Sequence, residues 1–162
     1  MITISIDNRT NEDLPVEDYR ACAQFVLERQ NVPDNAELSL SLIDVDEMRQ
    51  LNFQYRGIDE PTDVLAFECD GTLVDGFENA GEAFFGDVFL LGDVVIAPAV
   101  AREHALSFDS SFAQEMYLML IHGILHLLGY DHTFDDDYEK MTALENDLLT
   151  AFNKGIPELG LL

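Results

Sequence analysis

The chain has 162 residues, 48% of them hydrophobic and 10% aromatic, which is enough apolar material for the core of one domain. Its 32 acidic residues against 8 basic ones give a net charge of -24, which argues against the broad basic face of most nucleic-acid-binding proteins. We predict a single domain over residues 1–162 and interpret the charge as a solvated surface, because net charge bears on solubility rather than on the chemistry of a site.

No stretch approaches the roughly 18 apolar residues of a membrane span, and the N-terminus lacks the basic region, apolar block and cleavage site of a secretory signal. We therefore expect a cytoplasmic protein with no membrane contact. Cys22 and Cys69 are far apart and neither belongs to a Cys-x-x-Cys pair, so both are expected to be reduced thiols.

Hydrophobic periodicity predicts two strands and two helices in the first part of the chain. Residues 2–6 and 38–42 alternate apolar with polar side chains, as half-buried strands do. Between them, a helix is expected from about Pro15 to Gln30. After the second strand, Asp44 or Asp46 is expected to cap a short helix.

The middle of the chain is less regular. Residues 62–67 predict a third strand that is too apolar for an edge fully open to water. Residues 70–89 contain spaced glycines and acidic residues, which indicate a hairpin-like loop of low order. A fourth strand is expected over residues 91–97, and Pro98 suits the first turn of a helix that runs to about Leu106.

Two helices are predicted in the last third. Asp109 or Ser110 is expected to cap a long helix over residues 112–128, which is apolar on nearly all sides and therefore central. A last helix begins near Asp135, and its acidic start suits the positive end of the helix dipole. Its inward face is expected to carry Tyr138, Met141, Leu144, Leu148 and Leu149. These elements predict an α+β fold in which a small mixed four-stranded sheet packs with about five helices.

Residues 122–132 hold three of the four histidines in the chain. His122 and His126 are four residues apart, so on a helix both imidazoles face one side. Gly129 suits a left-handed cap after which the chain would return His132 to the same point. A pair of histidines at this spacing is often only a hydrogen-bonded core pair, but three with a glycine break indicate a metal site, because unpartnered imidazoles are costly to bury.

We expect His122, His126 and His132 to bind one zinc ion per chain, and nickel would suit the same ligands. Three protein ligands leave one position of a tetrahedral zinc open, which is the arrangement of catalytic sites and indicates hydrolysis. The metal site is thus predicted on the central helix and the turn after it.

The histidine spacing is also that of the metzincin proteases, which carry a Glu directly after the first His as general base. Here that position is Gly123, so peptide hydrolysis by their mechanism is not expected. A Gly123→Glu substitution would be expected to restore that base.

The stretch His-Gly-Ile-Leu-His-Leu-Leu-Gly-Tyr-Asp-His at 122–132 resembles the signature of the YbeY family of metal-dependent endoribonucleases. Residues 55–57 and 61–67 are similar to a second signature of that family, and residues 91–96 to a third. Ala66 and Glu68 depart from it, since a Ser and a Pro are usual there.

The resemblance implies a single-strand-specific, metal-dependent endoribonuclease that processes the 3′ end of 16S ribosomal RNA during ribosome maturation. It also implies Arg56 as the functional arginine, whereas chemistry alone leaves an ion pair with a nearby carboxylate as an equal alternative. The implied partners are ribosomal RNA and ribosomal subunits or proteins, and a monomer is favoured.

Two other functions remain open: a ribosome-assembly binding protein with a structural metal and no cleavage, and a metzincin-like metalloprotease that lacks the usual Glu. Outside the three ligands, His104 is interpreted as a surface residue, and Asp131 either orients a ligand imidazole or caps the turn.

Overall fold

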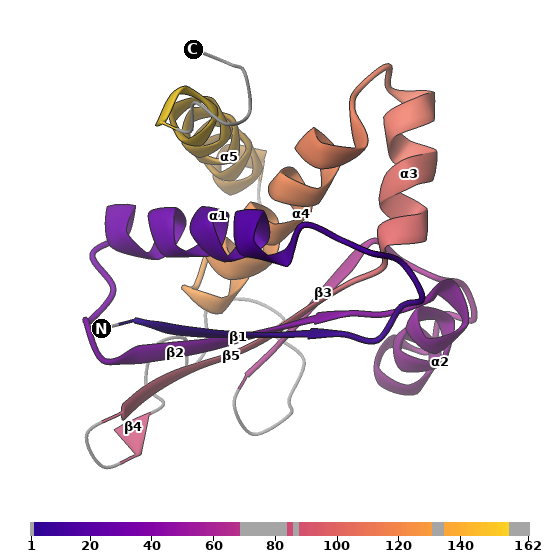
Figure 1. Ribbon diagram of the computed structural model, residues 1–162, viewed down its shortest axis with the longest axis horizontal. Helices are drawn as coiled ribbons and strands as arrows, with labels where there is room; N and C mark the ends of the chain where they lie inside the picture. The colour runs from indigo at the N-terminus through magenta and orange to yellow at the C-terminus, as the bar shows by residue number, and fades with distance from the viewer. Residues whose placement is uncertain (1, 69–83, 86–87, 131–134, 156–162) are drawn as a thin grey trace.

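The computed structural model describes residues 2–68, 84–85, 88–130 and 135–155 (Figure 1). Its elements in chain order are β1 (Thr3–Asn8), α1 (Val16–Arg29), β2 (Ala36–Leu42), α2 (Val45–Arg56), β3 (Val64–Phe67), β4 (Phe84–Phe85), β5 (Val88–Ile96), α3 (Pro98–Ser107), α4 (Phe112–Leu127) and α5 (Asp135–Gly155).

The strands form one mixed sheet in the order β1-β2-β5-β3, and β4 pairs with β5 beside this path. The pairs β1–β2 and β2–β5 are parallel, whereas β3 runs antiparallel to β5 with Ala66 opposite Val94. The predicted α+β class, four-stranded mixed sheet and five helices are confirmed. The short β4 was not predicted, and most of the expected loop over residues 70–89 lies outside the described residues.

Helices cover the sheet unequally. In Figure 1, α1, α4 and α5 lie on one side of the sheet and α2 lies on the other. Alternate side chains of β3 point to opposite faces of the sheet. Ala66 belongs to the larger core under α4, whereas Leu65 and Phe67 belong to the smaller core with Met48 of α2. This explains how an apolar strand stands at the end of the strand order: both of its faces are buried.

Helix α4 is the centre of the larger core, as predicted. It packs against α1, α3 and α5 and against strands β3 and β5. The predicted cap is wrong by one or two positions, because Ser111 accepts the backbone N–H of Gln114 at 3.1 Å. Asp109 and Ser110 are used elsewhere: Asp109 has a positive φ of 52° and the Ser110 N–H donates to the carbonyl of Ala105, so both belong to the turn that ends α3.

Helix α5 docks on α4 by apolar packing and a pair of amide hydrogen bonds. Phe152 is buried against the ring of Tyr117, and the side chains of Gln114 and Asn153 donate to each other at 3.1 and 2.7 Å. The prediction that Tyr138 faces inward is wrong, since it is 55% exposed.

Cys22 is a buried free thiol, and burial raises its pKa well above the ordinary value. Cys69 lies outside the described residues. Among the helices that the structure describes, none has the length and apolar character needed to span a bilayer.

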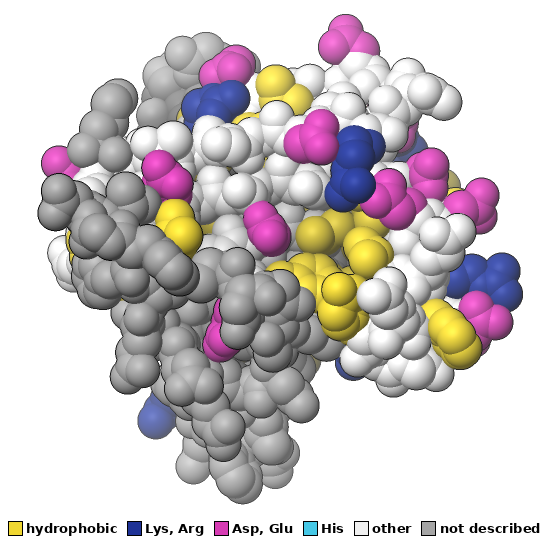
Figure 2. All heavy atoms as spheres, turned by 90° about the horizontal axis from the view of Figure 1, so that it is seen from below, with side chains coloured by type: hydrophobic (Ala, Val, Ile, Leu, Met, Phe, Trp, Pro, Cys, Tyr) yellow, Lys and Arg dark blue, Asp and Glu magenta, His cyan; other side chains and the backbone are white. Residues whose placement is uncertain are grey.

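On the face of the molecule seen in Figure 2, the described acidic side chains do not gather into one patch. Figure 2 shows the side of the sheet that faces away from α4, where Asp and Glu side chains are scattered among a few Lys and Arg. Most of the described arginines are already paired with carboxylates: Arg9 with Asp7 and Glu47, Arg20 with Glu17, Arg49 with Asp59, and Arg102 with Glu12.

Candidate metal centre

Two histidines converge on the last turns of α4. His122 and His126 lie one helical turn apart, and their Nε2 atoms are 3.1 Å from each other. The ring centroids are 4.5 Å apart. The predicted i, i+4 spacing therefore places both imidazoles at one point, as the helical period requires.

The Nε2 separation suits two ligands of a single ion. Zinc binds imidazole nitrogens at about 2.0–2.1 Å, which places two ligand nitrogens of a tetrahedral site roughly 3.3 Å apart. A direct hydrogen bond between the rings would have a similar length. A carboxylate on Nδ1 places the lone pair of a neutral His122 on Nε2, where it can bind a metal ion or accept a hydrogen bond from His126.

That carboxylate is Glu145 of α5. Its Oε1 contacts Nδ1 of His122, and Glu145 is 9% exposed. Sequence reasoning missed this residue. The available signal was its position on the buried stripe of α5 with Met141, Leu148 and Phe152, where an acidic residue is unusual.

Helix α4 ends at the predicted left-handed glycine. Gly129 has a positive φ of 99°, which glycine adopts without the strain of a side chain. The N–H of Gly129 donates to the carbonyl of His126, and the N–H of Tyr130 to that of Leu125, each at 3.0 Å, which is the hydrogen-bond pattern of a Schellman motif.

The third predicted ligand cannot be placed. His132 and Asp131 lie outside the described residues. Within the described part of the chain, no group of three or more His, Cys, Asp or Glu side chains is arranged to hold a metal. The three-histidine site therefore stays a prediction, of which two ligands are seen together.

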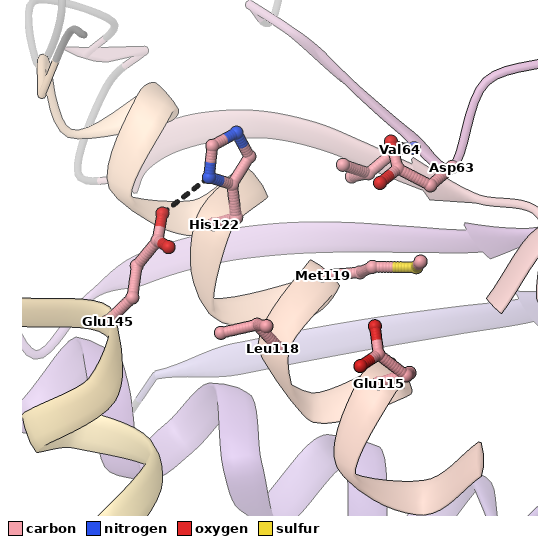
Figure 3. A pocket seen from close by; sticks show the side chains of 7 residues that line it. All are labelled: Asp63, Val64, Glu115, Leu118, Met119, His122 and Glu145. Atoms are coloured by element: carbon pink, nitrogen blue, oxygen red, sulfur yellow. Dashed lines mark hydrogen bonds and ion pairs between the residues drawn. The ribbon is translucent and has the colours of Figure 1, made fainter. Parts of the chain in front are cut away.

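A pocket of about 140 Å³ opens beside His122 (Figure 3). It is lined by Asp63, Val64, Glu115, Leu118, Met119, His122 and Glu145. Figure 3 shows Glu145 reaching His122 from α5, with Asp63 and Val64 on the opposite side of the pocket. The volume is below the roughly 300–1,000 Å³ of small-molecule sites, so the pocket is too small to enclose a ligand of that size.

The packing around Gly123 leaves no room for the glutamate that metzincins carry at this position. Gly123 is buried, and a β-carbon built on it would lie 2.7 Å from Cγ1 of Val94 and 3.2 Å from Cγ2 of Val64. The position directly after the first histidine thus faces the sheet and not the site. The expectation that Gly123→Glu would restore a general base is therefore wrong, since its side chain has no room there.

Arg56 is the last residue of α2, and Gly57 follows as a left-handed cap with φ 73°. It is exposed, and among the described residues no hydrogen bond or ion pair joins it to another side chain. The structure records no contact between Arg56 and either histidine. The segment after it is tethered to α2, because Arg49 binds Asp59 at 2.8 and 3.0 Å and Asn52 Nδ2 donates to the carbonyl of Glu60 at 2.8 Å.

His104, interpreted as a surface residue, is half-buried on α3. Its Nδ1 lies 3.8 Å from Oδ2 of Asp63, and its ring packs against Phe108. It contacts the far lining of the pocket and not the paired histidines.

Converging histidines on the central helix of an α+β domain are typical of hydrolases with histidine metal centres. The sequence profile of the family described as Endoribonuclease YbeY matches residues 5–153. The chain therefore belongs to the YbeY endoribonuclease family.

Relatives of the same name support this assignment, and a solved structure shares the fold. A protein of Salinispora tropica named Endoribonuclease YbeY is 39% identical over 151 residues, which are 93% of this chain and 96% of that protein. One of the same name from Nocardia farcinica is 35% identical over 157 residues, covering 97% of this chain and 84% of that protein. The solution structure of TM1509 from Thermotoga maritima matches with a TM-score of 0.57 and 27% identity, over 98% of this chain and 95% of that one.

Proposed function

We propose that this protein is a metal-dependent endoribonuclease that cleaves single-stranded RNA and processes the 3′ end of 16S ribosomal RNA in the cytoplasm. Family membership supports the nuclease activity. The single observation that carries the metal dependence is the 3.1 Å approach of the Nε2 atoms of His122 and His126, with Glu145 on the opposite ring nitrogen of His122.

We propose zinc as the ion, with nickel as a replacement that the same ligands accept. His122 and His126 would hold it, with His132 as the third ligand. When bound, zinc supplies Lewis-acid activation of water and polarises a phosphoryl oxygen. The residues of the chain then have separate roles. The histidines would bind the ion, and Arg56 would donate hydrogen bonds to the phosphate and offset the negative charge that develops on it.

The acidic surface limits how RNA is bound. A net charge of -24 repels a polyanion over long distances, so attraction has to come from the ion, from Arg56 and from a basic partner. We propose that ribosomal proteins or a ribosomal subunit supply that partner and that the protein itself is a monomer.

The test compares metal-free protein with protein reloaded with zinc on a structured ribosomal RNA fragment and on casein. We expect RNA cleavage only after reloading, and no cleavage of casein. Stoichiometric metal without RNA cleavage would instead indicate a binding protein with a structural metal. Chelator-sensitive cleavage of casein would indicate a protease and contradict the proposed function.

A further inference from the structure

Glu145 is an unusual carboxylate for its position. In the described part of the chain it is the only charged residue that is buried, and its side chain is 12% exposed. Burying a carboxylate is unfavourable unless a partner binds it. The partner that the structure shows is Nδ1 of His122, on a different helix and 23 residues away in sequence.

The position of Glu145 is set by packing that does not involve the histidine. Helix α5 is anchored by Phe152 against Tyr117 and by the reciprocal hydrogen bonds of Gln114 and Asn153. The carboxylate is therefore presented from a docked helix, and the imidazole orients to meet it. A contact held in this way can fix the ring of a ligand before any ion binds.

We propose that Glu145 is a positioning residue of the metal centre. Its carboxylate accepts the Nδ1–H of His122, which selects the tautomer with an unprotonated Nε2 and turns that atom toward Nε2 of His126. It also holds the ring in the plane and direction that bring its Nε2 beside that of His126. This inference rests on the proposed function, because it concerns the affinity of the same centre for its ion.

The first test is the zinc affinity of Glu145→Gln, measured by competition with a chelating dye. The amide keeps the size of the side chain and loses the charge, so affinity is expected to fall by about 10- to 100-fold. The matched control is Glu115→Gln, which removes a negative charge from the same pocket at a side chain that lies apart from the imidazole in Figure 3. Its zinc affinity is expected to change by less than about threefold, as fits the weak effect of partly solvated charges.

The second test uses the metal-free protein and needs no activity. In nitrogen NMR at mildly alkaline pH, we expect Nδ1 of His122 to carry the proton in the wild type and the two tautomers to be mixed in Glu145→Gln. The Tm of the metal-free Glu145→Gln protein should differ from that of the metal-free wild type by less than about 4 °C, because the contact orients a ligand rather than holds the fold.

The outcomes separate the two proposals. Equal losses of affinity in Glu145→Gln and Glu115→Gln, an Nδ1 of His122 without a proton in the wild type, or a large fall in Tm would each overturn the positioning role while the metal centre stands. A wild type that binds no zinc would overturn the proposed function and the effect of Glu145 on affinity. The NMR result on Nδ1 would still decide whether Glu145 sets the tautomer.

Discussion

Replacing Arg56 by alanine is expected to lower the single-turnover rate of RNA cleavage by about 100- to 1,000-fold, which is the typical cost of losing one donor that stabilises charge in a transition state. Bound metal and Tm should not change. The chain has only 8 Lys and Arg residues, and most described arginines are already paired with carboxylates. Arg56 is exposed and uncommitted in the described part of the chain, so its guanidinium is available to a phosphate.

The control for Arg56→Ala is Arg29→Ala, since Arg29 stands in the last turn of α1 as Arg56 does in α2. Arg29→Ala should leave the rate unchanged. Arg56→Lys should recover only part of it, because an ammonium group is a point charge without the two-pronged geometry of a guanidinium. Full activity of Arg56→Ala would show that Arg56 does not contact the phosphate, and loss of metal or stability would show that it supports the fold.

Replacing Gly123 by glutamate is expected to destabilise the protein by more than about 4 kcal/mol, enough to prevent folding of many domains of this size. Two costs add in this variant. The β-carbon collides with Val94 of β5, whose branched side chain has little freedom to move. The carboxylate would then be buried between helix and sheet without a partner.

The measurement is urea unfolding of Gly123→Glu beside Gly155→Glu, which adds the same side chain in the last turn of α5, where a β-carbon has no neighbour within 4 Å. Gly155→Glu should unfold near the wild-type midpoint. A folded Gly123→Glu protein that cleaves peptides would contradict the packing of α4 on the sheet, because it would require that side chain to reach the metal centre.

Local patterns predicted the parts of the fold and site that depend on local rules. The 3.6-residue period placed His122 and His126 on one face of a central helix, and Gly129 indicated the left-handed cap that ends it. Alternation in residues 38–42 identified a strand of the parallel sheet. Each of these features is set by residues within a few positions of one another.

Tertiary contacts decided what the sequence left open. Glu145 meets His122 only because α5 docks on α4, and no local rule pairs residues so far apart. A glutamate is excluded at position 123 because the side chain of Val94, on strand β5, packs directly against Gly123 of helix α4. The cap of α4 shifted to Ser111 because the preceding turn uses Asp109 and Ser110 to end α3.

The most direct test of the metal centre is elemental analysis of the purified wild type beside His126→Ala, with His104→Ala as the control histidine that lies away from the pair. We predict one equivalent of zinc, or of nickel in its place, in the wild type and in His104→Ala, and none in His126→Ala with its helical circular dichroism retained. A wild type without stoichiometric metal, or a His126→Ala protein that keeps it, would contradict the metal centre.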